Sequence, residues 1–569
     1  MPVFKQELQM IYDRKPWLKS YDPGVEPEIQ IPDKSLTECF IDTCRQFTDR
    51  AALHYMGMNM TFGELLEQSG RFARGLIDKG LGKGDVVTVH LPNIPQYLVA
   101  MVGTLRAGCV LSGLSPLLIS DEIIYQLNDC RARALVTLDA LFETKFAPVA
   151  DRVPDVKLVL VTGALDMLSG VRATAFPKPL PGKEVMPFLD FVGQHPDALP
   201  EVPCAQGDIC YLQYTGGTTG PSKGAMLTHG NMVANIHQYD YWMQHERGNE
   251  VLLTGFPMFH QAGLFVASSA LARAYTQILI PDPRNLDHIV LEVQRHRPTL
   301  VHNVPSLYLM LLAHEEFRKQ DFSRVKCCMS GAAPFPADKI KFLEEVMGTG
   351  KMVEVWGMTE TSPLITVNPS RGRKKTGSVG LPLPNTCLRV VDLADGKSEV
   401  RLGEEGELVC SGPQVMKGYL NKPDETRNAL REHAGARWMH TGDVGRMDED
   451  GYVYVVDRAK DMIIVGGYKV FSSEVEDRFY KHPAIGMCAL IGVPNPERPE
   501  SEVVKLVVQK SALHRDAPDG EVEAELRAFA REKLAPYKTP KVYEFVDAIP
   551  LTSVGKVNKK ALRPGTIRS

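Results

Sequence analysis

The amino-acid sequence predicts an α/β protein, with a large N-terminal domain of doubly wound sheets, a β-rich subdomain and a small α+β C-terminal domain. Three observations support this fold class. Apolar strand-like runs alternate with helix-like segments up to about residue 330. After about residue 380 the runs become shorter and are separated by glycine and charged residues. Past residue 457 two further apolar strands and an amphipathic helix follow. Alternating strands and helices are typical of a largely parallel sheet.

The alternation is clearest near the N-terminus. Residues 61–64 (TFGE) form a capping box that opens a helix with its apolar residues on one face. Residues 84–93 (GDVVTVHLPN) then predict a buried strand, and residues 94–108 predict a second helix. Further strands of the same kind are expected at 134–138, 156–163, 209–213, 300–304 and 326–330.

The later part of the chain indicates two smaller bodies. Segments 403–412 (GEEGELVCSG) and 448–458 (DEDGYVYVVDR) predict short strands, so we expect a β-rich subdomain at about 381–457 within an N-terminal domain 1–457. The remaining residues, 458–569, combine strands at 488–493 and 503–509 with an amphipathic helix. We therefore expect them to form a separate α+β domain.

Composition narrows the class of protein. The 569 residues are 44% hydrophobic and 24% charged, with a net charge of −4 and a pI of about 6.5, so no basic field indicates a nucleic-acid partner. The N-terminal residues include no signal-like apolar core, and no run of about 18 apolar residues predicts a membrane span. We expect a cytoplasmic protein whose eleven cysteines are reduced and mostly buried.

A glycine- and threonine-rich loop, TGGTTGPSK at 215–223, is the first candidate site. Glycines let the backbone approach a ligand closely, while hydroxyls and a lysine suit a phosphate group. The loop does not match the G-x-x-x-x-G-K-[ST] pattern, because Pro221 or Ser222 stands where that pattern requires its second glycine. From these residues alone, a flexible surface loop is an equally good interpretation.

Five other segments carry candidate residues: SGAAPF at 330–335, VWGMTETSP at 355–363, residues 440–470, LTSVGKVNKKAL at 551–562 and FPMFHQAGLF at 256–265. Glu360 beside Thr359 could hold a magnesium ion, and His260 lies in an apolar run. Taken singly, each has a simpler interpretation as a solvated carboxylate, a surface ion pair, a turn lysine or a core histidine.

Together the six segments closely resemble the adenylate-forming superfamily of acyl-CoA synthetases, luciferases and nonribosomal-peptide adenylation domains. The resemblance runs from about Leu36 to Leu562. The motif sequences, and the segment RKPWLKSYDPGV at 14–25, are most similar to those of fatty-acyl-CoA ligases. It implies two half-reactions. ATP and a carboxylic acid first give an acyl-adenylate and pyrophosphate, and coenzyme A then displaces AMP to form a thioester.

The resemblance also implies roles for individual residues. The phosphate loop would comprise Thr215, Gly216, Gly217, Thr218, Thr219, Gly220 and Lys223. The adenine would be bordered by Gly331, Ala332, Ala333, Pro334, Trp356 and Gly357. Thr359 would meet the α-phosphate and Glu360 would hold Mg²⁺, while Asp443 and Arg458 would bind near the ribose.

Further roles fall on the C-terminal domain and the acid-binding side. Lys556 would reach the carboxylate and the α-phosphate during adenylation. Lys460 would be the hinge about which a mobile C-terminal domain rotates, so that Gly466 and Gly467 leave room for pantetheine. His260 would gate the acyl pocket.

The acyl pocket is expected at Phe259, Ala262, Gly263, Leu264 and Gly357. The stretch 254–272 contains no acidic residue to pair a substrate ammonium, so an amino acid is disfavoured. Acetate-specific relatives carry a tryptophan where this chain has Gly357. These features favour a medium- or long-chain fatty acid, with an aryl or alicyclic acid as the alternative.

Two hypotheses of other classes remain open at this point. One is an enzyme that shares only the first half-reaction, such as a luciferase-like oxygenase or a donor of acyl groups to a carrier protein. The other is a catalytically silent nucleotide-binding protein, although such a protein need not keep Lys556, Glu360 and Asp443. The expected small-molecule partners are ATP, Mg²⁺, coenzyme A and a carboxylic acid, and a homodimer is left open.

Overall fold

The structure is a computed structural model that describes residues 11–168, 177–196, 202–215, 221–433, 435–458, 461–465, 468–495, 502–552 and 557–563. The chain forms two compact units. Unit 2 comprises residues 20–387 and 411–439, and unit 1 comprises the described residues of 1–19, 388–410 and 440–569. The predicted domain boundaries stay predictions.

Unit 2 contains two large sheets. The nine-stranded sheet has the order β16 (Leu381–Pro382), β15 (Leu364–Val367), β14 (Met352–Gly357), β13 (Cys327–Ser330), β12 (Leu300–Asn303), β10 (Val251–Thr254), β11 (Thr276–Leu279), β1 (Ala51–Tyr55) and β2 (Met58–Thr61). Its strands from β14 to β1 pair in parallel, whereas β15, β16 and β2 are antiparallel additions. The predicted strands at 300–304 and 326–330 are confirmed.

The second sheet has eight strands. Their order is β19 (Gly418–Tyr419), β9 (Lys223–Thr228), β8 (Ile209–Thr215), β4 (Val110–Gly113), β3 (Val86–His90), β5 (Ala134–Leu138), β6 (Leu158–Thr162) and β7 (Glu184–Pro187). All neighbours from β8 to β7 pair in parallel, and β9 and β19 are antiparallel. The predicted doubly wound, largely parallel architecture is confirmed.

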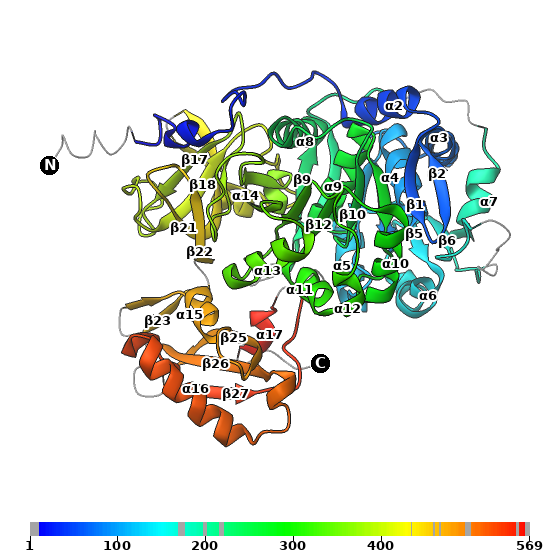
Figure 1. The fold of residues 1–569 in the computed structure, drawn as a ribbon. Helices are drawn as coiled ribbons and strands as arrows, with labels where there is room; N and C mark the ends of the chain where they lie inside the picture. The colour runs from blue at the N-terminus through cyan, green and yellow to red at the C-terminus, as the bar shows by residue number, and fades with distance from the viewer. Residues whose placement is uncertain are drawn as a thin grey trace. The chain divides into compact units, whose positions relative to one another are not determined.

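Helices connect and cover these strands (Figure 1). They are α2 (Leu36–Gln46), α3 (Phe62–Asp78), α4 (Pro95–Arg106), α5 (Ser120–Asp129), α7 (Phe188–Gly193), α8 (His229–Met243), α9 (Gln261–Arg273), α10 (Leu286–His296), α11 (Pro305–Ala313), α12 (Glu315–Arg318), α13 (Ala337–Met347) and α14 (Pro423–Ala429). The predicted capping box begins α3, because Thr61 and Glu64 each bond to the other's backbone N–H.

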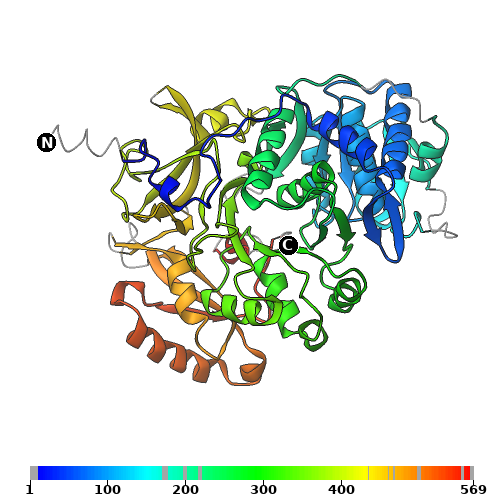
Figure 2. The ribbon, with the colours of Figure 1, turned by 45° about the horizontal axis from the view of Figure 1, so that its top comes forward.

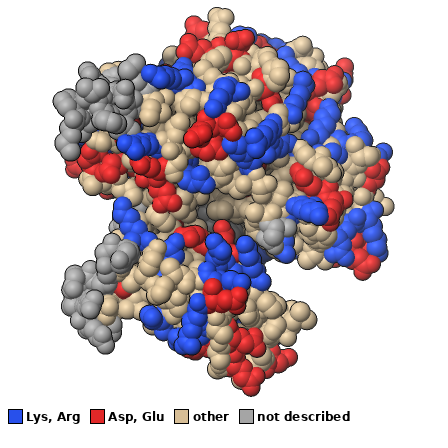
Figure 3. All heavy atoms as spheres, turned by 60° about the vertical axis from the view of Figure 1, so that its left-hand side comes forward, with Lys and Arg blue, Asp and Glu red and all other residues tan. Residues whose placement is uncertain are grey.

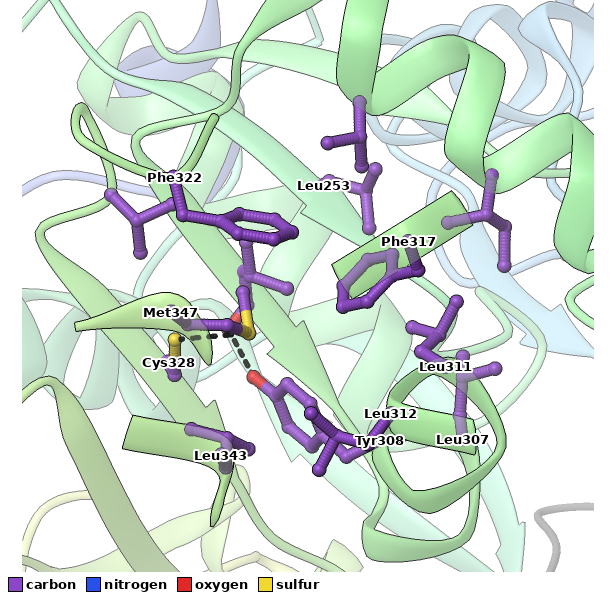
Figure 4. Close-up of a cluster of buried hydrophobic side chains, with 14 of the residues drawn as sticks. Leu253, Leu307, Tyr308, Leu311, Leu312, Phe317, Phe322, Cys328, Leu343 and Met347 are labelled. Atoms are coloured by element: carbon purple, nitrogen blue, oxygen red, sulfur yellow. Dashed lines mark hydrogen bonds between the residues drawn. The ribbon is translucent and has the colours of Figure 1, made fainter. Parts of the chain in front are cut away.

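An apolar cluster holds α11, α12 and α13 against one face of the nine-stranded sheet (Figure 4). Tyr308 is fully buried, and its hydroxyl donates to the Met329 carbonyl of β13 at 3.1 Å. Phe317 and Phe322 pack with their ring centres 4.9 Å apart. This core fixes the end of β13, from which one of the predicted nucleotide-binding turns emerges.

Unit 1 contains a β-rich part and an α+β part. The β-rich part is a sheet of β17 (Cys387–Val391), β18 (Gly406–Ser411), β21 (Ala436–Met447) and β22 (Val453–Arg458). Strand β21 continues from unit 2, where its first residues pair with β20 (Leu430–His433). The predicted change to short strands after about residue 380 is therefore confirmed.

The α+β part has a three-stranded sheet of β25 (Ile485–Pro494), β26 (Glu502–Lys510) and β27 (Val542–Phe545), and a hairpin of β23 (Ile463–Val465) and β24 (Tyr468–Val470). Helices α15 (Ser472–Phe479) and α16 (Asp519–Lys533) pack on one face through buried side chains such as Phe479 and Leu526. Figure 2 shows α16 running alongside these strands. The segment that ends in α17 (Lys559–Leu562) packs on the other face.

Two predictions from composition can be compared with the structure. All eleven cysteines are free thiols, eight of them buried, as expected. Among the described residues, none of the helices combines the length and the apolar character that crossing a membrane requires.

Candidate active site

The carboxyl ends of the parallel strands carry most of the predicted site residues of unit 2. In the nine-stranded sheet, β10 leads into the predicted acyl segment, β13 into the SGAAPF turn and β14 into the WGMTETSP turn. In the eight-stranded sheet, β8 ends at Thr215, where the predicted phosphate loop begins. Ligands of open α/β sheets bind outside the carboxyl ends of the strands, so these positions suit a ligand site.

The predicted phosphate loop is described at its two stems only. Thr215 and Lys223 pair across β8 and β9, and the Thr215 hydroxyl donates to the Lys223 carbonyl at 3.4 Å. The Lys223 ammonium lies 2.8 Å from the Glu425 carboxylate and 4.9 Å from the centre of the Tyr419 ring. The five loop residues between the stems, Gly216, Gly217, Thr218, Thr219 and Gly220, lie outside the described residues.

Glu360 lies in the short helix η4 (Thr359–Thr361), directly after β14, and is 6% exposed. Its Oε1 accepts a 2.6 Å hydrogen bond from the Tyr419 hydroxyl, and its carbonyl accepts one from the Met416 N–H at 2.8 Å. Among the described residues, no Lys, Arg or His side chain lies within 4.0 Å of its carboxylate. Thr359, which precedes it, is partly exposed.

The SGAAPF turn is anchored at one end and accessible in its middle. Phe335 is 5% exposed, and its ring centre lies 5.9 Å from that of Tyr308. Ala332 has a φ of +69°, which is uncommon for a residue with a side chain. Ala333 and Pro334 are exposed. The turn therefore presents backbone and small side chains, as a surface that borders a flat ring would.

Gly331 and Trp356 lie at adjoining ends of β13 and β14. A Cβ at Gly331 would lie 2.7 Å from Cγ2 of Val355, so the close packing of the two strands requires glycine there. Trp356 is 8% exposed and pairs with Thr366 of β15. Its stacking on an adenine ring stays a prediction.

Gly357 meets backbone atoms in the direction of its missing side chain, and its role in the acyl pocket stays a prediction. The sequence comparison predicts that its missing side chain opens the floor of the acyl pocket. A Cβ on Gly357 would instead lie 1.8 Å from the carbonyl oxygen of Pro363 and 3.0 Å from Cα of Leu364. The direction of the missing side chain is thus filled by backbone, because β14 and β15 meet at an irregular pair here. Even an alanine would distort the turn that carries Glu360.

Glu354 lies two residues before Trp356 and was not singled out by sequence. It is 8% exposed. Burial raises its pKa to about 7, although the backbone N–H groups of Gly377 and Phe335 act in the opposite direction. Because Phe335 belongs to the SGAAPF turn, the protonation of Glu354 is linked to the backbone of that turn.

The predicted acyl segment is held from the other sheet. The Asn93 side chain donates to the Phe256 carbonyl at 2.9 Å and accepts from the Met258 N–H at 2.8 Å. The Tyr97 hydroxyl donates to the Met258 carbonyl at 2.9 Å. These bonds come from residues that follow β3, so the carboxyl ends of the two sheets meet at this segment.

His260 and its neighbours begin helix α9. His260 is the N-cap, and its Nδ1 accepts from the Ala262 N–H at 3.2 Å. Phe259 and Ala262 are partly exposed, whereas Leu264 is fully buried. A Cβ at Gly263 would lie 2.2 Å from the Pro257 carbonyl, which makes glycine a packing requirement. The capping role of His260 is structural, and its role as a gate stays a prediction.

In unit 1, the two residues predicted to bind near a ribose are adjacent. Asp443 and Arg458 face each other across β21 and β22, with Arg458 Nε 2.8 Å from Asp443 Oδ1. The Asp443 side chain is 6% exposed and that of Arg458 is 41% exposed. Thr441 holds this part of β21 in place, because its hydroxyl donates to the Leu408 carbonyl at 2.7 Å and accepts from the Asp443 N–H at 3.1 Å.

Comparison with known proteins identifies the family. A model of AMP-binding enzymes matches residues 40–420, more than half of the chain, and a model of the C-terminal domain of AMP-binding enzymes matches residues 474–556. The chain belongs to the AMP-binding enzyme family.

Relatives of this AMP-binding enzyme match it over nearly its whole length. It is 37% identical over 565 residues to a long-chain-fatty-acid–CoA ligase of Bacillus subtilis, which covers 96% of this chain and 98% of that protein. It is 36% identical over 522 residues to a feruloyl-CoA synthase of Amycolatopsis, covering 90% and 95%. The crystal structure of ATP-bound MatB from Rhodopseudomonas palustris shares 30% identity with a TM-score of 0.80, covering 93% and 98%.

Four further residues of the expected site lie outside the described residues: Lys460, Gly466, Gly467 and Lys556. Their roles as hinge, pantetheine channel and adenylation lysine stay predictions. A described neighbour, Lys559, reveals how the segment that follows Lys556 is held. Its ammonium lies 2.8 Å from the Glu476 carboxylate and donates to the Ser472 hydroxyl at 2.5 Å.

The Lys559 contacts form part of a buried network in this AMP-binding enzyme. The Lys559 and Glu476 side chains are 15% and 14% exposed. Burial alone would lower the pKa of Lys559, but Glu476, Asp457 and Asp461 raise it above its ordinary value. Asp457 Oδ2 in turn accepts from the Ser472 hydroxyl at 2.7 Å. The network ties α17 to β22, the strand that ends at Arg458.

The residues around Glu360 suit a magnesium ion that arrives with a nucleotide. Magnesium in nucleotide enzymes is usually held by one or two carboxylates together with phosphate oxygens and water. Among the described residues, no group of three or more His, Cys, Asp or Glu side chains is arranged to hold a metal by itself. A single buried carboxylate with no nearby cation suits a magnesium ion that is also held by phosphate oxygens and water, and does not form a complete metal site made of protein ligands alone.

Proposed function

We propose that this AMP-binding enzyme is an ATP-dependent acyl-CoA synthetase that joins a medium- or long-chain fatty acid to coenzyme A, with release of AMP and pyrophosphate. The observation that carries the proposal is the 37% identity to the Bacillus subtilis long-chain-fatty-acid–CoA ligase over 96% of the chain. Family membership, the carboxyl-edge position of the predicted residues and the apolar acyl segment support it.

Adenylation would be carried by positioning and by charge neutralisation. The glycine-rich loop between Thr215 and Lys223 would enclose the β- and γ-phosphates. Glu360 would hold Mg²⁺, which supplies positive charge to the phosphate oxygens when bound. Lys556 would stabilise the negative charge that develops at the carboxylate and the α-phosphate. Asp443 would accept from the ribose hydroxyls while Arg458 keeps its carboxylate oriented.

Thioester formation would follow with a different arrangement of the C-terminal domain. Rotation about Lys460 would withdraw Lys556 and bring Gly466 and Gly467 to the acyl-adenylate, where their small size leaves room for pantetheine. His260, at the start of α9, would separate the acyl pocket from the nucleotide.

An aryl acid is the second candidate substrate. The 36% identity to a feruloyl-CoA synthase over 90% of the chain favours it, because that relative is nearly as similar as the fatty-acid ligase. The partly exposed Phe259 and Ala262 would suit either an alkyl chain or a ring.

A product panel distinguishes these functions. The enzyme would be incubated with ATP, Mg²⁺, coenzyme A and one acid at a time: acetate, octanoate, dodecanoate, palmitate, benzoate, cyclohexane carboxylate or ferulate. We expect AMP, pyrophosphate and the acyl-CoA, with the highest kcat/KM for dodecanoate or palmitate. A preference for ferulate or benzoate would select the second candidate. ADP as the nucleotide product, or turnover that does not depend on coenzyme A, would contradict the proposal.

We also propose small-molecule partners and a cytoplasmic location. Lys and Arg are interspersed with Asp and Glu over the face shown in Figure 3, and the net charge is −4, so we expect small molecules to be the partners. A cytoplasmic location would be tested by cell fractionation. A homodimer would be tested by light scattering of the purified chain.

A further inference from the structure

Unit 2 contains a cavity on the eight-stranded sheet that the proposed reaction does not use. Its volume is about 540 Å³, within the range of small-molecule binding sites. It lies beyond the end of helix α5, where Cys130 and Arg131 follow the last helical residue, Asp129. Residues at the amino ends of β3, β5 and β6 line it, so it opens at the edge of the sheet opposite to Thr215.

The floor of the cavity is apolar. Val86, Val110, Leu212, Met226 and Leu420 line it, and the pairing of their strands places them on one face of the sheet. Cys130, which is 4% exposed, adds a small and largely apolar side chain to this lining. Such a floor suits an alkyl chain.

The rim of the cavity carries an excess of positive charge. Three cations, Arg131, Arg133 and Lys157, face two acids, Asp85 and Asp155. Asp85 is already engaged by Arg133 at 2.9 Å and by the Gly82 N–H at 2.9 Å.

Two of the cations remain available to an anion. The Arg131 side chain is 82% exposed, and its Nε lies 3.6 Å from Asp155, so that pair is long and open to solvent. Lys157 is exposed and has no acidic partner within 4.0 Å among the described residues. Because the backbones of Arg133 and Lys157 are hydrogen-bonded neighbours, the cations gather at one end of the apolar floor.

From this arrangement we propose that the cavity is a second binding site for an alkyl carboxylate. The alkyl chain would lie against Val110 and Leu212, and the carboxylate would lie between Lys157 and Arg131. The site is separate from the predicted catalytic one. Strand β8 contributes Ile209 and Leu212 to the cavity and ends at Thr215, roughly 20 Å beyond Ile209 and roughly 10 Å beyond Leu212 at 3.3 Å per residue. An occupant would therefore contact the same β8–β9 hairpin whose far end carries the predicted phosphate loop.

The test is the binding stoichiometry of dodecanoate when the catalytic site is blocked. The full-length enzyme would be saturated with a non-reactive dodecanoyl-sulfamoyl-adenosine, and labelled dodecanoate binding would be measured by equilibrium dialysis. We expect one further equivalent of dodecanoate. No saturable binding under these conditions would overturn the proposal. The proposal does not rest on the proposed function, whose failure would appear separately as failure of the blocking analogue to bind.

Two variants and a matched control locate the binding. Lys157→Glu reverses an exposed charge at the rim and should weaken dodecanoate binding at least about tenfold, since it places like charges together. Ile209→Trp should fill the cavity and abolish the second equivalent. Lys341→Glu makes the same charge change at an 86% exposed lysine of α13 and should bind as the parent does. Parent-like binding by both Lys157→Glu and Ile209→Trp would contradict the site.

Ligand variation tests the two halves of the site. Dodecanol lacks the charge and butyrate lacks the chain, and both should bind at least about tenfold more weakly than dodecanoate. Equal binding of dodecanol would refute the role of the cationic rim. A change of oligomeric state in Ile209→Trp would show instead that a second copy of the chain covers this cavity, and would also overturn the proposal.

Discussion

Two regions of the molecule each hold a buried acidic side chain, and they do so in different ways. In unit 2, Glu360 is 6% exposed and is held by the Tyr419 hydroxyl, with no cation within 4.0 Å among the described residues. In unit 1, Glu476 is paired with Lys559 at 2.8 Å within a network that includes Asp457. One carboxylate is held by a neutral donor and the other by a fixed cation.

The difference separates a site prepared for a ligand from a site that stabilises its own fold. A carboxylate buried without a cation costs free energy, which a bound cation would offset. The Lys559–Glu476 pair is already compensated, so its loss should damage the folded protein before any ligand binds. Substitutions in the two parts should therefore differ in what they change: catalysis for Glu360 and stability for Lys559.

The largest effect is expected for Lys559→Leu. It leaves Glu476 buried without its cation, which typically costs about 3–5 kcal/mol. The free energy of unfolding, followed by hydrogen exchange of β25 and β26, measures the loss. Lys559→Leu combined with Glu476→Leu should recover most of it, and Lys541→Leu, at an exposed lysine of the same body, should change little. Full stability of the single Lys559→Leu variant would show that the network is not structural.

Glu360→Gln should impair catalysis and leave stability unchanged, the opposite of Lys559→Leu. It keeps the shape and removes the charge, so the thermal stability of the ligand-free protein should not fall. Adenylation should decrease about 10²-fold, and the Mg²⁺ concentration needed for half-maximal rate should rise. A stability loss as large as that of Lys559→Leu, with unchanged Mg²⁺ dependence, would place Glu360 among the structural carboxylates instead.

Glu354→Gln tests a carboxyl group whose charge the fold disfavours. With a folded pKa of about 7 and an ordinary value of 4.5, the folded state binds more protons than the unfolded state in this window, so stability falls as pH rises from about 4.5 to 7. The Gln variant lacks this loss. Relative to the parent it should gain on the order of 2 kcal/mol between pH 5 and pH 8 in urea unfolding. Parallel pH profiles would mean that Glu354 titrates normally.

Tyr419→Phe should have the smallest effect. It removes the hydroxyl that holds Glu360 and leaves the ring over which Lys223 lies. Loss of a hydrogen bond to a charged group costs about 1.5–3 kcal/mol. Because the loss reaches ATP only through the position of Glu360, we expect the lower end of this range, a fall of about tenfold in kcat/KM for ATP. Tyr55→Phe, which removes a hydroxyl bound to the Ala164 carbonyl, should leave this constant unchanged. If Tyr419→Phe and Tyr55→Phe changed kcat/KM for ATP equally, the Tyr419 hydroxyl would have no specific role in holding Glu360.

The sequence predicted the strands and the turns that follow them, because these depend on local patterns. The capping box of Thr61 and the buried run at 84–93 are examples, and both appear in the structure. The glycine- and threonine-rich motifs follow strands, so their position at the carboxyl edges could also be expected. Strand order within the two sheets could not be predicted, since it depends on crossovers that leave no local pattern.

The residues that hold the site were also missed, because their partners are distant in sequence. Tyr419 is 59 residues from Glu360, and Lys559 is 83 residues after Glu476. No spacing rule links such pairs. Gly357 is a further example: the family resemblance implies that its missing side chain leaves room for a longer acid, and the sequence does not reveal that the Pro363 carbonyl lies in the direction of that side chain.

The most direct test of the account is whether the enzyme forms an acyl-adenylate that depends on Glu360 and does not depend on coenzyme A. Exchange of labelled pyrophosphate into ATP would be measured with dodecanoate and Mg²⁺, in the absence of coenzyme A. The account predicts dodecanoate-dependent exchange by the parent and an approximately 10²-fold loss in Glu360→Gln. Acyl-CoA formation without any such exchange, or parent-like exchange in Glu360→Gln, would contradict it.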